Sequence, residues 1–125
     1  MIQRPKYLSA LKEYRDIPLV KILAGIRRCG KSTILEMLKN ELISDGVPKE
    51  RIICMRYTSE EFDAGMTDKD MYNAIKAKMT DDERCYLLLD EVQEVENWEK
   101  AVNSLLENTN SDIYVTGSNS KLMAG

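Results

Sequence analysis

One segment of the sequence combines residue types that could hold a phosphate group. Gly25 is followed after four residues by Gly30, Lys31 and Ser32, and Thr33 completes the string. The two glycines let the backbone wrap tightly with its N–H groups turned inward, and the start of a helix attracts anions. Lys31 would place a point charge on the β- and γ-phosphates, and the Ser32 hydroxyl would bind Mg²⁺. The pattern therefore predicts a phosphate-binding loop of the GxxxxGK[ST] type.

The other residues of this loop have smaller expected roles. Ile26, Arg27, Arg28 and Cys29 supply backbone around the diphosphate, and the two arginine side chains are expected to point outward. Thr33, one residue further into the helix, can donate to the α-phosphate. We count residues 25–33 as the nucleotide-binding set.

A second segment places two carboxylates directly after an apolar run. The run at 86–89 leads into Asp90 and Glu91. Since successive side chains of a strand point to opposite faces, the two acids should do different jobs. We expect Asp90 to hold Mg²⁺ next to Ser32, and Glu91 to be the general base that orients and deprotonates an attacking water.

A third polar segment follows the last apolar run. Thr116, Ser118 and Asn119 lie around Gly117, which marks a turn. A polar side chain at this place can sense the γ-phosphate or position water, and we favour Thr116 and Ser118 for that role. The alternative is an ordinary polar loop.

Composition excludes several kinds of chemistry. With no histidine, neither imidazole-based hydrolysis nor zincin-type catalysis is possible, and three cysteines without a CxxC pair argue against a zinc site or a disulfide framework. Residues 1–51 carry 11 Lys and Arg against 6 Asp and Glu, whereas residues 52–125 carry 7 against 15. The charges form no extended basic stripe, so direct nucleic-acid binding is unsupported.

Four apolar runs alternate with helical patterns. Strands are expected over 19–24, 51–57, 86–89 and 113–116, with the first read as buried. Helices are expected after Pro5, over 31–43, after a capping box at 67–70, and from Asn97, which is expected to cap the last of them. The inner face of that last helix carries Trp98, Ala101, Val102, Leu105 and Leu106. This alternation predicts a three-layer α/β fold, in which helices cover both faces of a parallel sheet. Ligands of such folds bind at the carboxyl ends of the strands.

The count of strands narrows the fold class. One further strand lies between the strand before the phosphate loop and the strand before Asp90, so the acids follow the third strand. This is the arrangement of the P-loop NTPase division that has an additional strand and a catalytic glutamate. The base-reading Asn-Lys-x-Asp motif of GTPases and the Leu-Ser-Gly-Gly signature of ABC proteins are both absent.

Three strings together resemble one family. The strings at 25–32, 87–99 and 115–120 resemble those of AAA-type ATPases of bacteria and archaea, in which a P-loop domain precedes a C-terminal domain of unknown function. The likeness covers residues 4–122. It implies an AAA core with sheet order 5-1-4-3-2, ATP as the nucleotide, and the roles given above for the loop, for Asp90 and Glu91, and for the segment after residue 115.

Members of that family continue past the third string, through an arginine that completes the site and a fifth strand. The resemblance therefore implies that residues 1–125 are the N-terminal part of an ATPase domain, cut after the fourth core strand, with the first strand on an open edge. We expect such a piece to bind ATP and Mg²⁺ and to hydrolyse ATP slowly, because the missing arginine can be worth about 10³ to 10⁵ in rate.

Mg²⁺-dependent ATP hydrolysis is the leading interpretation. A small-molecule or nucleoside kinase shares the loop but should carry an Arg-rich lid, which is not visible, and a non-hydrolysing ATP-binding switch is the third possibility. The expected partners are ATP and, in a full-length protein, further copies through AAA-type interfaces. No apolar run approaches the roughly 20 residues of a membrane span, and the polar start lacks a signal peptide's core, so a cytoplasmic location is expected.

Overall fold

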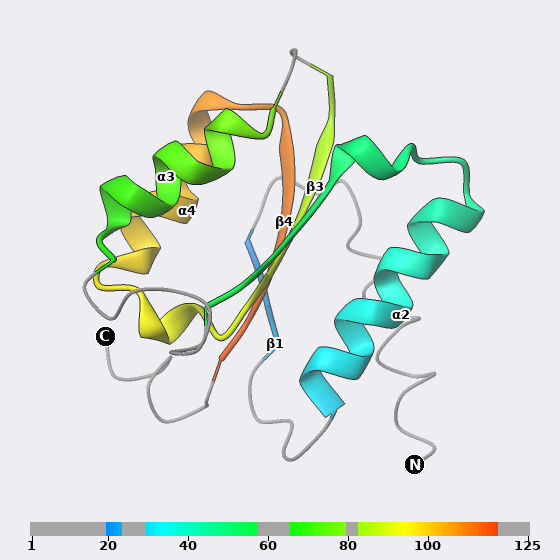
Figure 1. Ribbon diagram of the computed structural model, residues 1–125, viewed down its shortest axis with the longest axis horizontal. Coiled ribbons are helices and arrows are strands. Elements are labelled where there is room, and N and C mark those ends of the chain that lie inside the picture. The colour runs from blue at the N-terminus through cyan, green and yellow to red at the C-terminus, as the bar shows by residue number, and fades with distance from the viewer. Residues whose placement is uncertain (1–19, 24–29, 58–65, 80–82, 118–125) are drawn as a thin grey trace.

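Strands and helices alternate along the chain. The computed structural model describes residues 20–23, 30–57, 66–79 and 83–117 (Figure 1). The strands are β1 (Lys21–Leu23), β2 (Ile52–Arg56), β3 (Cys85–Asp90) and β4 (Ser111–Thr116). The helices are α2 (Gly30–Ser44), α3 (Asp68–Ala77) and α4 (Trp98–Asn108), and short 3-10 turns η1 (Lys49–Arg51) and η2 (Val92–Glu94) precede β2 and α4. The predicted α/β alternation is confirmed.

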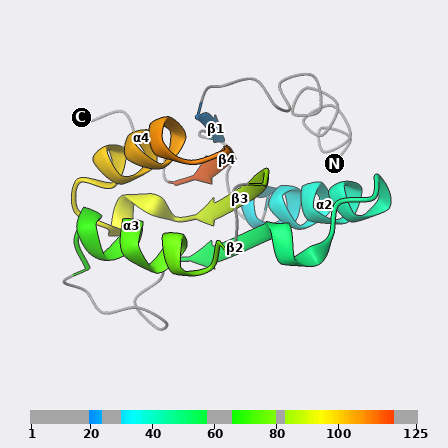
Figure 2. The same ribbon diagram turned by 90° about the horizontal axis from the view of Figure 1, so that it is seen from above.

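The four strands form one parallel sheet in the order β1-β4-β3-β2. This order agrees with the four corresponding positions of the order implied by the family resemblance. Helices α3 and α4 cover one face and α2 covers the other, which gives three layers (Figures 1 and 2). All strands point the same way, so their carboxyl ends share one edge of the sheet.

Each face of the sheet has its own apolar cluster, because alternate residues of a strand point to opposite sides. Leu87, Leu89, Ile113 and Val115 pack with α3 and α4, while Leu88 and Tyr114 pack with α2. All residues of β3 and β4 are buried, which is typical of the central strands of a parallel sheet. The two central strands therefore form the rigid base from which the loops at the carboxyl edge project.

The two helices on one face begin in different ways. Helix α3 begins with the capping box that the sequence predicted, formed by Thr67 and Asp70. The Thr67 hydroxyl accepts a hydrogen bond from the Asp70 N–H, and the Asp70 carboxylate accepts one from the Thr67 N–H. Asn97 precedes α4 as expected, but its backbone is left-handed (φ 60°) and its side chain makes no capping hydrogen bond. The prediction that the Asn97 side chain caps α4 is thus wrong. Leu106 is only half-buried, while the rest of the predicted inner face is buried.

The first and fourth strands differ from prediction where a buried ion pair, Lys21 with Asp112, joins them. Strand β4 begins two residues early, at Ser111, and includes a fully buried Asp112 whose carboxylate accepts from the Lys21 ammonium and, at 2.9 Å, from the Tyr114 hydroxyl. Lys21, on β1, is itself buried, whereas Ile22 is 53% exposed. Strand β1 is thus not buried along its length, although the mostly apolar run was expected to form a buried strand.

Within the described residues, no helix is long and apolar enough to cross a membrane. The helix expected after Pro5 lies outside those residues.

Candidate functional site

Asp90 ends strand β3 at the carboxyl edge of the sheet. Its side chain lies on the α2 face and is buried, with 6% of the residue exposed. The Thr116 hydroxyl, from the end of the neighbouring strand β4, donates to Asp90 Oδ1. Thr116 is completely buried, so this contact is shielded from water. The paired strand ends thus hold the carboxylate in one orientation.

Glu91 occupies a different environment from the acid before it. Its backbone is left-handed (φ 58°, ψ 50°), a region that costs a non-glycine residue roughly 1 kcal/mol. The Glu91 N–H donates to Thr116 Oγ1 at 3.0 Å, and Gln93 Nε2 donates to Glu91 Oε1 at 2.7 Å. The Glu91 side chain is half-buried and its hydrogen-bond partner differs from those of Asp90.

Thr116 connects the two acids through one hydroxyl group. It donates to the side chain of Asp90 and accepts from the backbone of Glu91. The sequence singled out Thr116 as a candidate for contact with phosphate or water. In the structure its hydroxyl contacts both acids, and its contact with phosphate or water stays a prediction.

Arg56 also reaches the site, from the end of the edge strand β2. Its Nε lies 3.5 Å from Asp90 Oδ2, and the two residues are register partners across β2 and β3. Sequence reasoning missed Arg56 because it treated the run 51–57 only as a strand. A basic residue at the carboxyl end of a neighbouring parallel strand was the available signal.

The first turn of α2 begins at the same edge. Strand β1 ends at Leu23 and α2 starts at Gly30, so the helix N-terminus follows the carboxyl end of its strand (Figure 1). This turn contains no acidic residue, which leaves the positive end of the helix dipole uncompensated by its own side chains. The backbone of Gly30, Lys31, Ser32 and Thr33 lies in this turn, while their side chains lie outside the described part. The loop residues Gly25, Ile26, Arg27, Arg28 and Cys29 lie outside it too, as do Ser118 and Asn119.

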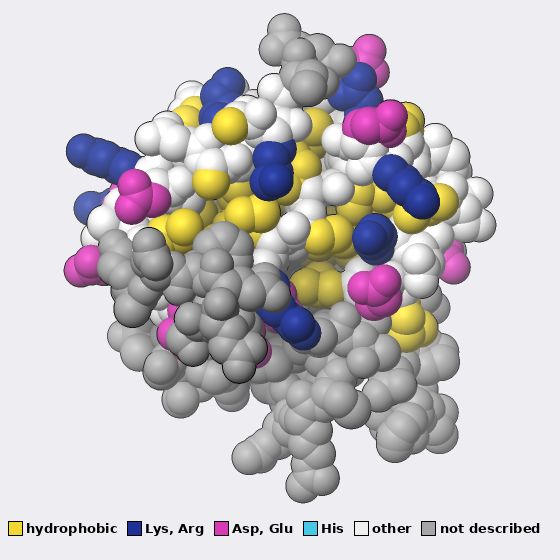
Figure 3. Space-filling view, viewed as in Figure 1, with side chains coloured by type: hydrophobic (Ala, Val, Ile, Leu, Met, Phe, Trp, Pro, Cys, Tyr) yellow, Lys and Arg dark blue, Asp and Glu magenta, His cyan; other side chains and the backbone are white. Residues whose placement is uncertain are grey.

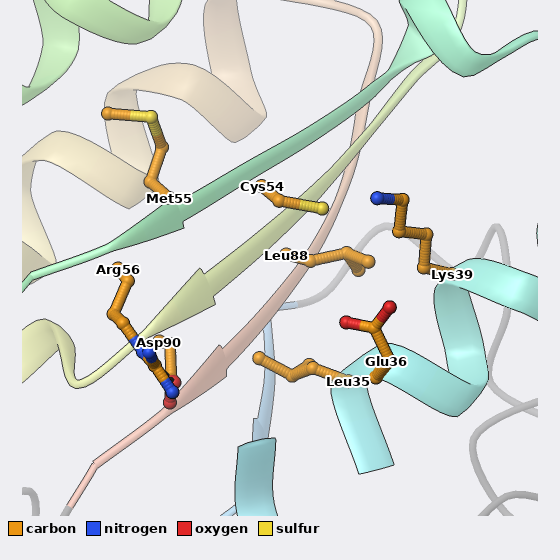
Figure 4. A pocket seen from close by; sticks show the side chains of 8 residues that line it. All are labelled: Leu35, Glu36, Lys39, Cys54, Met55, Arg56, Leu88 and Asp90. Atoms are coloured by element: carbon orange, nitrogen blue, oxygen red, sulfur yellow. Dashed lines mark hydrogen bonds and ion pairs between the residues drawn. The ribbon is translucent and has the colours of Figure 1, made fainter. Parts of the chain in front are cut away.

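A groove of about 300 Å³ extends from Asp90 between α2 and β2. Figure 3 shows hydrophobic side chains gathered between the two helical layers on this side, with Lys and Arg around them. The groove is lined by Leu35, Glu36, Lys39, Cys54, Met55, Arg56, Leu88 and Asp90 (Figure 4). Burial raises the pKa of the Cys54 thiol, the positive charge of Lys39 lowers it, and the negative charge of Glu36 raises it.

The donor set at the edge fits magnesium better than zinc. Among the described residues, no three Cys, Asp or Glu side chains gather closely enough to hold a metal ion by themselves. Mg²⁺ is commonly held by one or two protein oxygens together with substrate phosphates. The buried carboxylate of Asp90, at the carboxyl edge of the sheet, has the chemistry of such an oxygen ligand.

Comparison with known proteins supports this assignment of the fold. A family model described as an AAA domain, AAA_14, matches residues 18–125. The chain is 37% identical over 126 residues to an uncharacterized protein of Haemophilus influenzae, covering 100% of this chain and 32% of that protein. It is 29% identical over 123 residues to an uncharacterized protein of Methanocaldococcus jannaschii, covering 98% of this chain and 26% of that protein. It thus spans about a third or less of the length of these relatives.

Membership of an AAA family indicates ATPase-like nucleotide binding, and the parallel sheet with helices on both faces is consistent with it. The chain belongs to the AAA_14 family of AAA domains.

Proposed function

We propose that this chain binds ATP together with Mg²⁺ at the carboxyl edge of its sheet and hydrolyses it. The observation that carries the proposal is the paired geometry of Asp90 and Glu91, which one buried hydroxyl of Thr116 holds next to the edge where α2 begins. Two adjacent acids held in different orientations are what hydrolysis needs: one oxygen ligand for a cation and one base for water.

The first turn of α2 would hold the phosphates. Backbone N–H groups of residues 25–31 would donate to phosphate oxygens, and Lys31 would add its charge beside the β- and γ-phosphates. Thr33 would donate to the α-phosphate. Asp90 and Ser32 would hold Mg²⁺, which when bound neutralises charge on the phosphate oxygens.

Glu91 would act on the attacking water. A water oxygen attacks the γ-phosphorus, the bond from that phosphorus to the β–γ bridging oxygen breaks, and ADP leaves with that electron pair. Glu91 accepts the proton that the water loses. Its 2.7 Å contact with Gln93 and the backbone contact with Thr116 would keep the carboxylate in place for that transfer. Ser118 remains our candidate for contact with the γ-phosphate.

Binding of a fluorescent ATP analogue tests the phosphate site. Lys31→Ala should weaken affinity at least about tenfold, which corresponds to the roughly 1.4 kcal/mol of one charged contact. Lys100→Ala is the control, because Lys100 is an exposed lysine of α4, on the face of the sheet opposite to α2. Equal affinities of the two variants would contradict the phosphate-loop assignment.

Single-turnover phosphate release, with protein in excess over ATP, tests the base and detects slow hydrolysis. Glu91→Gln should reduce the rate at least about 100-fold without loss of ATP affinity, the usual contribution of a general base. Glu94→Gln is the matched control, because Glu94 ends the turn η2 that Glu91 precedes. A Glu91→Gln variant that keeps the full rate would overturn the role of Glu91. Phosphate that appears on an added nucleoside instead of in water would favour a kinase.

A further inference from the structure

Arg56 brings a cation to the carboxylate that is expected to hold magnesium. Its Nε lies 3.5 Å from Asp90 Oδ2, and Figure 4 shows the two side chains meeting at one end of the groove. Thr116 already donates to the other oxygen, Oδ1. In the structure, both oxygens of Asp90 therefore face donors from neighbouring strands.

The two members of this ion pair differ in exposure. The Asp90 side chain is 9% exposed, whereas the Arg56 side chain is 55% exposed. A buried carboxylate is costly without a nearby positive charge, and Arg56 reduces that cost. Because Arg56 is long, half in solvent and lines a groove of about 300 Å³, its guanidinium has space to move away from Asp90. The carboxylate is fixed and the cation beside it can move.

We propose that Arg56 regulates metal occupancy of the nucleotide site. The guanidinium neutralises Asp90 while no nucleotide is bound and competes with Mg²⁺ for Oδ2, since two cations beside one oxygen repel each other. Mg²⁺ alone then binds weakly, and its binding depends on the phosphates that accompany it. Arg56 leaves Oδ2 when the nucleotide and its cation bind. This inference rests on the proposed ATP site and adds to it a means of excluding free metal ions.

The test measures the affinity for a fluorescent ATP analogue in EDTA and in excess Mg²⁺, and takes the ratio of the two. Arg56→Gln removes the competing charge and should increase the ratio of the affinity in Mg²⁺ to the affinity in EDTA about fivefold. This factor corresponds to the usual strength of a partly exposed ion pair. Arg56→Lys keeps a cation and should stay within about twofold of the wild type. Circular dichroism checks folding, and Arg56→Met, which keeps most of the apolar stem, serves if the Gln variant does not fold.

Arg51→Gln is the matched control, because it makes the same charge change just before the other end of β2. Arg51 is five residues away, roughly 17 Å along the strand, beyond the screening length at physiological salt. Its ratio should equal that of the wild type. Two results would overturn the role of Arg56 while leaving the ATP site intact. The first is an Arg56→Gln variant that still binds ATP with an unchanged affinity ratio, and the second is an equal loss of affinity with and without Mg²⁺. Absence of ATP binding by the wild-type chain would overturn the proposed function as well.

Discussion

Replacing Thr116 with valine tests whether one hydroxyl holds both acids of the site. Valine has nearly the shape of threonine but can neither donate to Asp90 nor accept from the Glu91 N–H. Thr116 is completely buried, so water cannot readily take the place of the lost hydroxyl. The variant therefore removes two hydrogen bonds with little change in packing.

The expected cost follows from those two contacts. A buried polar group left without its partner costs about 1–3 kcal/mol, and more when the partner is charged, as Asp90 is. Glu91 also loses the 3.0 Å contact that helps hold its left-handed backbone. We expect Thr116→Val to lower the free energy of unfolding by about 3 kcal/mol. Thr116→Ser keeps the hydroxyl and loses one methyl group, which costs about 1 kcal/mol.

Urea unfolding followed by circular dichroism compares the two variants, and amide hydrogen exchange locates the effect. The Glu91 amide should exchange much faster in Thr116→Val, beyond the change that global stability causes at Leu87 in the middle of β3. Domains of this size usually have 5–15 kcal/mol of stability, so the variant should remain folded. If valine costs no more than serine and the Glu91 amide keeps its protection, the hydroxyl does not hold the acids.

Three further predictions concern other ionisable groups. Lys21→Met removes the ammonium that faces the buried Asp112 and should cost about 3–5 kcal/mol in urea unfolding, and adding Asp112→Asn should recover at least half of this loss. Burial raises the pKa of Tyr57 above its ordinary value of 10.0, so the unfolded chain ionises first and stability falls as pH rises above 10. The ionisation of Tyr57 should lower the free energy of unfolding by about 1.4 kcal/mol at pH 11. Urea melts at several pH values should show this loss in the wild type and not in Tyr57→Phe. Because burial raises the pKa of Cys54, iodoacetamide at pH 8 should label the Cys54 peptide more slowly in the native chain than in urea. Mass spectrometry measures both labelling rates, and equal rates would contradict this prediction.

The elements that depend on local patterns were predictable from the sequence. Apolar runs located all four strands, and the Thr67 capping box marked the start of α3. Those signals are contained in a few adjacent residues, so they need no knowledge of the fold. The order of the sheet followed from the family resemblance rather than from the runs themselves.

The features that were missed depend on contacts between distant residues. The start of β4 was placed too late because Asp112 looks like a loop residue until Lys21, 91 positions away in sequence, is seen to face it. The capping role given to Asn97 failed because its left-handed backbone leaves the side chain without a capping contact. Arg56 had no expected role because only the pairing of β2 with β3 brings it to Asp90.

The alternation of the strands explains why these polar groups meet. Three strands end in a polar residue on the face that α2 covers: Asp90, Thr116 and Arg56. In β3 and β4, the residues two positions earlier, Leu88 and Tyr114, lie on the same face. The same parity that buries apolar side chains against α2 thus brings a carboxylate, a hydroxyl and a guanidinium together at the edge where α2 begins. A shift of one residue in the register of β2 would move Arg56 to the other face and remove the cation from Asp90. The charge balance of the candidate site is therefore set by the register of the sheet, and substitutions that alter the register of β2 should alter metal binding even when they leave the nucleotide loop intact.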